Sequence, residues 1–174
     1  VRRILNDSRI EKPRLLRFFQ EYFGYPSATE VFKDDNTVRK AGIGGRYQAG
    51  IFVADTDALV LHILAKDQEV LRELLTTPET FLRQKPGTFY LRPQWWLHYN
   101  VTEGHALESM PVRLPPKQRA GVLTQPSWLI AHSTNFDNHA ILRGKWVRER
   151  LLGGFIPDTP ITVDAQLPDD PHLT

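Results

Sequence analysis

The chain of 174 residues contains no cysteine. It can therefore form no disulfide and no thiolate metal site, it has no cysteine nucleophile, and it cannot attach a c-type haem covalently. No apolar run reaches the roughly 18 residues of a membrane-spanning helix, and no signal-peptide pattern is present. A net charge of +2 without a dense basic cluster excludes the phosphate-binding stripe of a nucleic-acid-binding protein.

What is present is the composition of a globular protein, with 41% hydrophobic and 24% charged residues. The length is sufficient for one domain of ordinary size with a hydrophobic core. The sequence starts at Val1, and its only methionine is Met110. A natural reading frame begins with methionine, so we expect the chain to be a fragment of a longer protein.

Helical periodicity begins in the segment KPRLLRFFQEYFGY. The apolar side chains that recur there at helical spacing are Leu15, Phe18, Phe19 and Tyr22. Pro13 suits the first turn of a helix, and Gly24 suits the position just past its end. The segment predicts an amphipathic helix that buries this stripe.

The glycine-rich segment 33–50 predicts a long loop, since it is polar and neither a preceding strand nor a GK[ST] sequence supports a phosphate-binding loop. Helical spacing resumes at about residue 54. Asp55 and Asp67 are predicted to cap helix starts, and Thr77 with Pro78 predicts a third start. Two carboxylates near 55–57 also match metal ligands, but stabilisation of a helix N-terminus is the commoner role. His62 is predicted to be a packed or rim histidine.

Aromatic residues gather in the segment FYLRPQWWLHYN, where a short hairpin near 88–100 is one interpretation. Adjacent tryptophans beside tyrosines can stack on the rings of a carbohydrate or another large ligand, although such aromatics more often fill a core or an interdomain contact. The candidate ligand-binding residues are Tyr90, Arg92, Trp95, Trp96 and Tyr99.

Residue types of nucleophilic catalysis and metal binding are crowded into the segment 127–139. They are Ser127, His132, Ser133, Asp137 and His139. The GxSxG elbow of serine hydrolases and the HExxH spacing of zinc enzymes are both absent. We therefore favour a helix–turn–helix piece, with Thr124 and Pro126 at the first helix start, Asp137 or Asn138 at the second, and a helix end at Gly153. A point of attachment to a neighbouring domain is the alternative.

Three segments in the second half resemble a known group of proteins. RAGVLTQPSWLIAHS, RGKWVRERLLGG and IPDTPITVDAQLPDD, in this order, resemble the large multi-domain proteins of planctomycete-type bacteria that combine domains of unknown function with cytochrome c-like segments. LRFFQEYFGY, VFKDD and KDQEVLRELLTTPETFL are similar to the preceding domain of the same architecture. Most of the chain is covered, more weakly through the glycine-rich loop and residues 86–112.

The resemblance implies an exported, periplasmic bacterial protein in which a CxxCH segment follows the stretch like LPDDP. C-type haem is then expected downstream of this chain and no cofactor within it. The parent protein could be a redox enzyme, but no catalytic residue is implied here. The interpretation that follows is a non-catalytic helical scaffold that positions the haem-type domain. Its expected partners are the neighbouring domains, and the alternative function is binding of a polysaccharide or another large ligand through residues 89–99.

His132 is the candidate axial ligand to a haem attached elsewhere, although a capping or surface histidine is the commoner case. The predicted fold is mainly α, an irregular helical bundle with long loops and an extended proline-rich strap at the C-terminus. We expect residues 1–112 to be the C-terminal part of one helical domain of unknown function. Residues 113–174 would then form a second helical domain with the proline-rich tail.

Overall fold

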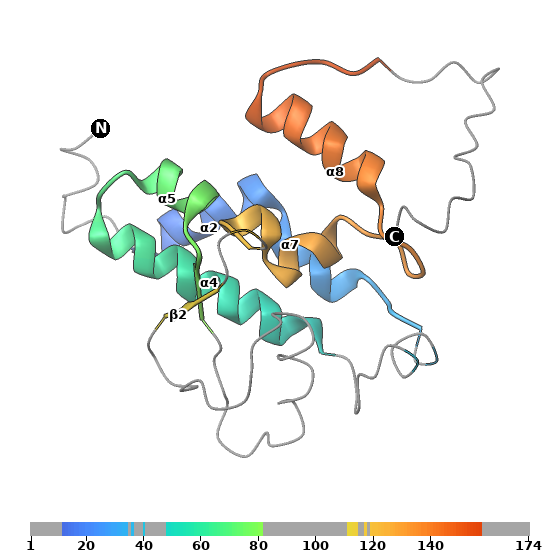
Figure 1. Ribbon diagram of the computed structural model, residues 1–174, viewed down its shortest axis with the longest axis horizontal. Coiled ribbons are helices and arrows are strands. Elements are labelled where there is room, and N and C mark those ends of the chain that lie inside the picture. Colours follow the sequence, from blue (N-terminus) through green and yellow to red (C-terminus); the bar gives the residue numbers. More distant parts are fainter. Residues whose placement is uncertain are drawn as a thin grey trace. The chain divides into compact units, whose positions relative to one another are not determined.

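The computed structural model describes residues 12–34, 36, 40, 48–81, 111–114, 117 and 119–157. The chain forms two compact units, residues 1–139 and residues 140–174. In agreement with the prediction, the described part is mainly helical, and its strands form one small two-stranded sheet (Figure 1). No described helix is long and apolar enough to cross a membrane. The division into domains at residues 112 and 113 stays a prediction.

Helix α2, Lys12–Phe23, confirms the first predicted helix. Pro13 lies in its first turn, and Gly24 follows its last residue with a φ of 69°, a conformation that glycine adopts without strain. The predicted stripe is partly wrong, because the Phe18 side chain is 58% exposed whereas Phe23 is fully buried. Residues four apart form the inward row of α2, and Phe18 lies about 100° round the helix from Phe19.

The short 3-10 helix η1, Tyr25–Glu30, leads away from α2, and helix α4, Ala49–Lys66, is the central helix of unit 1. It contacts α2, η1, α5 (Val70–Thr76), strand β1 (Glu79–Thr80) and helix α7 (Pro126–Ala131). Because α4 already begins at Ala49, Asp55 and Asp57 lie inside it, so the prediction that Asp55 caps a helix start is wrong. Asp67 does not cap the next start either, since it ends α4 with a φ of 48° and Glu69 precedes α5.

The third predicted helix start is wrong as well, since Thr77 ends α5 and strand β1, Glu79–Thr80, follows it. Strand β1 pairs antiparallel with β2, Val112–Arg113, in the register Glu79 with Arg113 and Thr80 with Val112. The Thr77 carbonyl accepts a hydrogen bond from the Gly121 N–H at 2.7 Å. The partners that keep this segment extended are more than thirty residues away in sequence, so the local pattern could not reveal them. The predicted hairpin near 88–100 lies outside the described residues.

The core of unit 1 lies where α4 meets η1, the sheet and helix α7, Pro126–Ala131, which the 3-10 turn η3, Val122–Thr124, precedes. One cluster of its buried residues comprises Ala28, Ala49, Phe52, Val112, Leu114 and Ile130. These side chains come from four separate segments of the chain. Residues after 119 therefore share one core with residues before 81.

Unit 2 is described over residues 140–157. Helix α8, Ala140–Trp146, continues into a π-helical turn, η4, Val147–Leu151. Gly153 follows with a φ of 64°, which confirms the predicted end of this helix. Arg148 and Arg150 lie in the last turn, where positive charge opposes the negative end of the helix dipole.

Candidate functional site

The crowded segment 127–139 is the strongest candidate site in the sequence, and its first half is helix α7. Pro126 occupies the first helical position as predicted. The residue that precedes α7 is Gln125, not Thr124, so the predicted capping role of Thr124 is wrong. The Thr124 hydroxyl instead accepts the Ala120 N–H at 2.8 Å and donates to the Ala120 carbonyl at 2.9 Å. It closes the turn before the helix.

Ser127 is fully buried and faces α4. Its hydroxyl lies 2.6 Å from the hydroxyl of Thr56, which itself donates to the Phe52 carbonyl at 2.9 Å. Thr56 has one hydroxyl proton, so Ser127 must be the donor in the pair. A serine with no exposed surface and its proton committed to another hydroxyl cannot attack a substrate. Ser127 is therefore a structural residue.

A second buried polar contact joins the same two regions. Thr80 of β1 donates its hydroxyl proton to the Gln125 side-chain carbonyl at 2.8 Å, and both residues are almost completely buried. Buried polar groups without a partner cost about 1–3 kcal/mol, so the contact favours this one arrangement of β1 and α7 over others.

His132 ends α7 and is 9% exposed. Its ring stacks on Trp128 with centroids 4.3 Å apart, and Nδ1 lies 2.9 Å from the Trp128 carbonyl oxygen. Donation of Nδ1–H to a backbone carbonyl is also the usual orientation of a histidine that binds metal through Nε2. The geometry is thus compatible with both the structural role and the axial-ligand role, and the latter stays a prediction.

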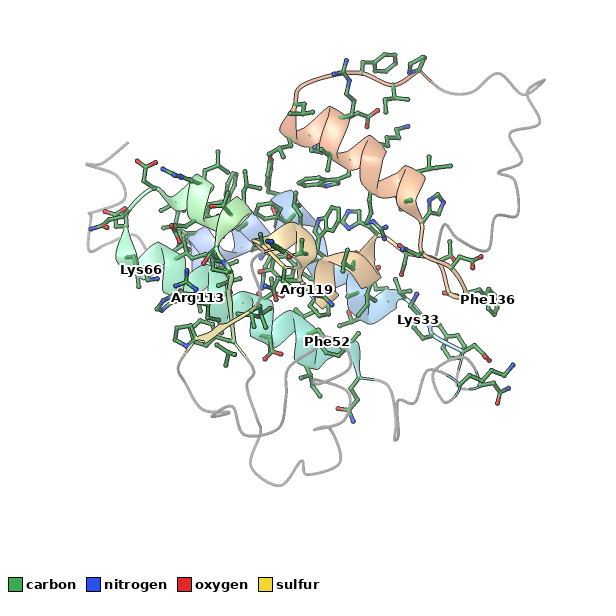
Figure 2. The ribbon with its side chains drawn as sticks, viewed as in Figure 1. Lys33, Phe52, Lys66, Arg113, Arg119 and Phe136 are labelled. Atoms are coloured by element: carbon green, nitrogen blue, oxygen red, sulfur yellow. The ribbon has the colours of Figure 1, made fainter. Side chains whose placement is uncertain are left out.

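Ser133 contacts a residue that the sequence did not indicate. The Lys33 ammonium donates to the Ser133 hydroxyl at 2.8 Å and also to the Thr134 carbonyl. Lys33 is labelled in Figure 2. Burial lowers the pKa of Lys33, and the Asp137 carboxylate partly opposes this effect. About one hundred residues separate Lys33 from these partners, so no local spacing could have found the contact.

Serine–lysine pairs act as nucleophile and base in some hydrolases. Here the N–H groups that could stabilise an oxyanion are occupied, since Ser133 N–H donates to Ile130 O at 3.0 Å and Thr134 N–H to Asp137 O at 3.0 Å. The pair also lies at the C-terminal end of α7, where the carbonyl dipoles repel negative charge. Lys33 is better explained as a cation that caps this helix end.

The turn after α7 confirms the predicted helix–turn–helix, but α8 begins at Ala140, so His139 precedes it and not the predicted Asp137 or Asn138. The Thr134 hydroxyl accepts the Asp137 N–H at 2.8 Å, and the Ser133 hydroxyl donates to the Ile130 carbonyl at 2.7 Å. The polar residues of this segment therefore cap and close the turn. His139 ends unit 1, half-buried, just before α8 begins.

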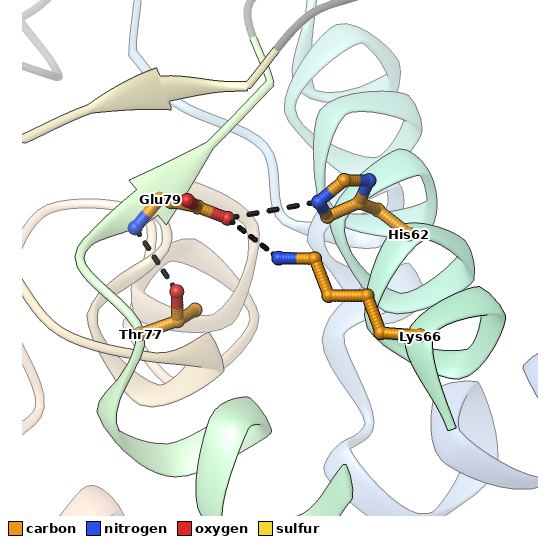
Figure 3. A network of polar contacts seen from close by, with 4 residues as sticks. All are labelled: His62, Lys66, Thr77 and Glu79. Carbon is orange, nitrogen blue, oxygen red and sulfur yellow. Dashed lines mark hydrogen bonds and ion pairs between the residues drawn. The ribbon is translucent and has the colours of Figure 1, made fainter. Parts of the chain in front are cut away.

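A separate polar network lies between α4 and β1 (Figure 3). Glu79 accepts a hydrogen bond from Lys66 Nζ at 3.2 Å, and His62 Nε2 is 3.6 Å from the same carboxylate oxygen, beyond hydrogen-bond distance. The His62 ring meets Phe81 edge-on, with the centroids 5.3 Å apart. His62 is thus the predicted rim histidine.

The two acidic residues considered as metal ligands lie in helix α4. Asp55 is fully buried in α4, and Asp57 accepts hydrogen bonds from Tyr25 at 2.6 Å and Gln20 at 2.8 Å. Burial first, and then the bond to Asp57, raises the pKa of Tyr25 far above its usual range. Over the described ranges, no three His, Cys, Asp or Glu side chains are grouped as a metal site requires. The aromatic candidates Tyr90 to Tyr99 lie outside these ranges, and ligand binding there stays a prediction.

The C-terminal part of the chain matches a known family. Residues 119–174 match the model of the family PSCyt3, protein of unknown function (DUF1588), a domain associated with planctomycete cytochrome c-type proteins. No curated protein and no solved structure matches the chain. The match supports the resemblance over the C-terminal part of the chain, and the wider multi-domain architecture stays a prediction.

Proposed function

We propose that this chain is a non-catalytic helical scaffold that holds a haem-type domain of the parent protein in a defined position. The observation on which the proposal rests is the way in which the family-matched segment is built into the upstream helices. Ser127 bonds to Thr56, Gln125 to Thr80 and Ser133 to Lys33, with donor–acceptor distances of 2.6, 2.8 and 2.8 Å.

Apolar packing supports the same role. Trp128 is 2% exposed and Ile130 is 8% exposed, and Ile130 belongs to the cluster that also contains Phe52 of α4. A segment held by both buried apolar side chains and buried hydrogen bonds cannot rotate against its neighbours without losing several contacts at once. Rigidity of this kind is what a positioning element requires.

The polar side chains of the crowded segment are used inside the fold, which favours a structural role over catalysis. The Ser127 hydroxyl is enclosed, and those of Ser133 and Thr134 close the turn. The activity of the parent protein would then reside in its other domains. Export to the periplasm belongs to the same proposal, and fractionation of cells that express the parent protein tests it.

The test uses the parent protein, expressed with haem maturation. Its reduced and oxidised absorption spectra should show c-type bands. Gln68, exposed in the turn between α4 and α5, is replaced by cysteine and spin-labelled, and pulsed EPR measures the distance from the label to the haem iron. A narrow distribution of distances is expected from a scaffold.

The matched control has the same label and a flexible Gly-Ser insertion after His139, which should broaden the distribution. A wild-type distribution as broad as that of the insertion variant would overturn the proposal, and so would a spectrum without c-type bands. A second label at Phe136, on the exposed turn, checks that the result is not local to position 68.

A further inference from the structure

Several apolar side chains of unit 2 are exposed. No residue of α8 or η4 is buried, and Ile141, Leu152 and Phe155 are 60%, 65% and 78% exposed. A helix of seven residues followed by a π-helical turn of five is marginal in water without tertiary packing. Exposed apolar side chains in such a group are typical of a protein-interaction surface.

The same segment is strongly basic. Its cationic side chains are Arg143, Lys145, Arg148 and Arg150, and Glu149 is its only acidic residue. The net charge over residues 140–157 is therefore +3, in a chain whose total net charge is +2. A partner that covers the exposed apolar side chains therefore meets a segment of net positive charge.

The Arg148 side chain lies close to Gly154. The Gly154 N–H donates to the Arg148 carbonyl at 2.8 Å, and a Cβ on Gly154 would lie 2.3 Å from Arg148 Nε. The arginine side chain thus occupies space that a side chain at position 154, the residue before Phe155, would fill. A substitution at Gly154 therefore displaces this cation.

We propose that α8, η4 and residues 152–156 form a docking surface for an acidic protein face with apolar pockets. Leu152 and Phe155 are the anchors of this surface, and Arg148 supplies a cation beside Gly154. The proposal rests on the proposed function for the source of that face, which is the haem-type neighbour in the parent protein. It adds where the neighbour binds and which charge its surface has.

The distribution of side chains favours a protein over a lipid surface. A helix that lies in a membrane interface separates its apolar face from its basic face. In this segment Arg143 and Lys145 lie between Leu142 and Trp146 in the sequence, so basic and apolar side chains share one part of the helix surface. A second copy of the chain is disfavoured because two surfaces of charge +3 repel each other.

The experiment titrates the full chain with an acidic c-type cytochrome and, for comparison, with a basic one, by calorimetry. The acidic cytochrome should bind, and the affinity should fall at least tenfold between 20 and 300 mM salt, roughly the range in which surface charges become screened. Replacing Leu152 and Phe155 by serine should weaken binding about tenfold or more, as expected of anchor residues.

Gly154→Ala is the sharper variant because it removes no charge and no apolar group. It displaces only the flexible Arg148 side chain, and it should lower the affinity several-fold. Gly144→Ala is its matched control, since a Cβ there meets nothing within 4 Å. Phe136→Ser, which removes an exposed aromatic ring from unit 1, should leave binding unchanged.

Equal binding of the acidic and basic cytochromes would overturn the proposal, as would equal effects of Gly154→Ala and Gly144→Ala. Binding to phosphatidylglycerol vesicles but not to the acidic cytochrome would identify a lipid surface instead. Self-association abolished by the serine variants would identify a second copy. The spin-labelled parent distinguishes the two proposals. If the distance distribution stays narrow in the serine variants, this docking surface is refuted and the proposed scaffold function stands. If the wild-type distribution is broad, the scaffold function itself is refuted.

Discussion

Replacing Thr56 by valine should destabilise the protein more than replacing Ser127 by alanine, although the two hydroxyls contact each other at 2.6 Å. The asymmetry follows from the direction of the bonds. Thr56 donates to the Phe52 carbonyl and accepts from Ser127, so removing Ser127 leaves Thr56 with a partner. Removing the Thr56 hydroxyl leaves a buried serine donor without an acceptor.

The magnitudes can be worked out from these contacts. Loss of one ordinary hydrogen bond costs about 1 kcal/mol, which we expect for Ser127→Ala. Thr56→Val also strands the serine donor in a site with no exposed surface, and we expect a cost of about 2–3 kcal/mol. In the double variant the stranded donor is gone, so its cost should lie below the sum of the single costs by about 1 kcal/mol.

Urea denaturation of the full chain, followed by far-UV circular dichroism, measures these free energies of unfolding. Phe136→Ser, at an exposed position, is the control and should change stability by less than about 0.5 kcal/mol. The argument is refuted if Ser127→Ala costs as much as Thr56→Val, or if the two substitutions are additive.

Three further outcomes are expected. Tyr25→Phe should cost about 1.5–3 kcal/mol through the lost hydrogen bond to charged Asp57. Folding raises the pKa of Tyr25, so the native protein retains a proton that the unfolded chain loses near pH 10. The stability of the wild-type protein should therefore fall above about pH 10. Denaturation measured as a function of pH should show that Tyr25→Phe lacks this loss. Gly121→Ala should lower the free energy of unfolding by more than about 3 kcal/mol, measured by thermal unfolding, because φ is 64° and a Cβ would lie 2.4 Å from a backbone carbonyl. Gly50→Ala in α4 is the control: a Cβ there meets nothing within 4 Å, and the substitution should stabilise the protein by about 0.5–1 kcal/mol. His132→Ala in the intact parent should shift the haem absorption bands if this histidine is an axial ligand, and unchanged bands would exclude that role.

The elements that were predicted correctly depend on local chemistry. Helix α2 follows from apolar spacing between Pro13 and Gly24, and the turn at 134–137 follows from side chains that bond to a backbone a few residues away. Gly153 ends the last helix for the same reason, since only its own backbone conformation is involved. Interactions of this short range depend only on neighbouring residues, so a sequence pattern is sufficient to predict them.

The errors arise where distant segments meet. The stretch at Thr77 resembles a helix start, yet its carbonyl bonds to Gly121 and strand β1 pairs with β2 about thirty residues later. The start of α4 was placed too late because Ala49 and its neighbours follow a glycine-rich segment, and their burial depends on packing against η1 and α7.

The residue pattern alone predicts the mainly helical class, excludes thiol chemistry in this chain and carries the resemblance that the family match supports over residues 119–174. What the crowded polar segment does depends on its tertiary contacts. Ser127 and Ser133 have the residue type of a nucleophile, but the bonds to Thr56 and Lys33 that commit them to the fold span about seventy and one hundred residues. A side chain is reactive or structural according to what surrounds it, and those surroundings form only when the chain folds.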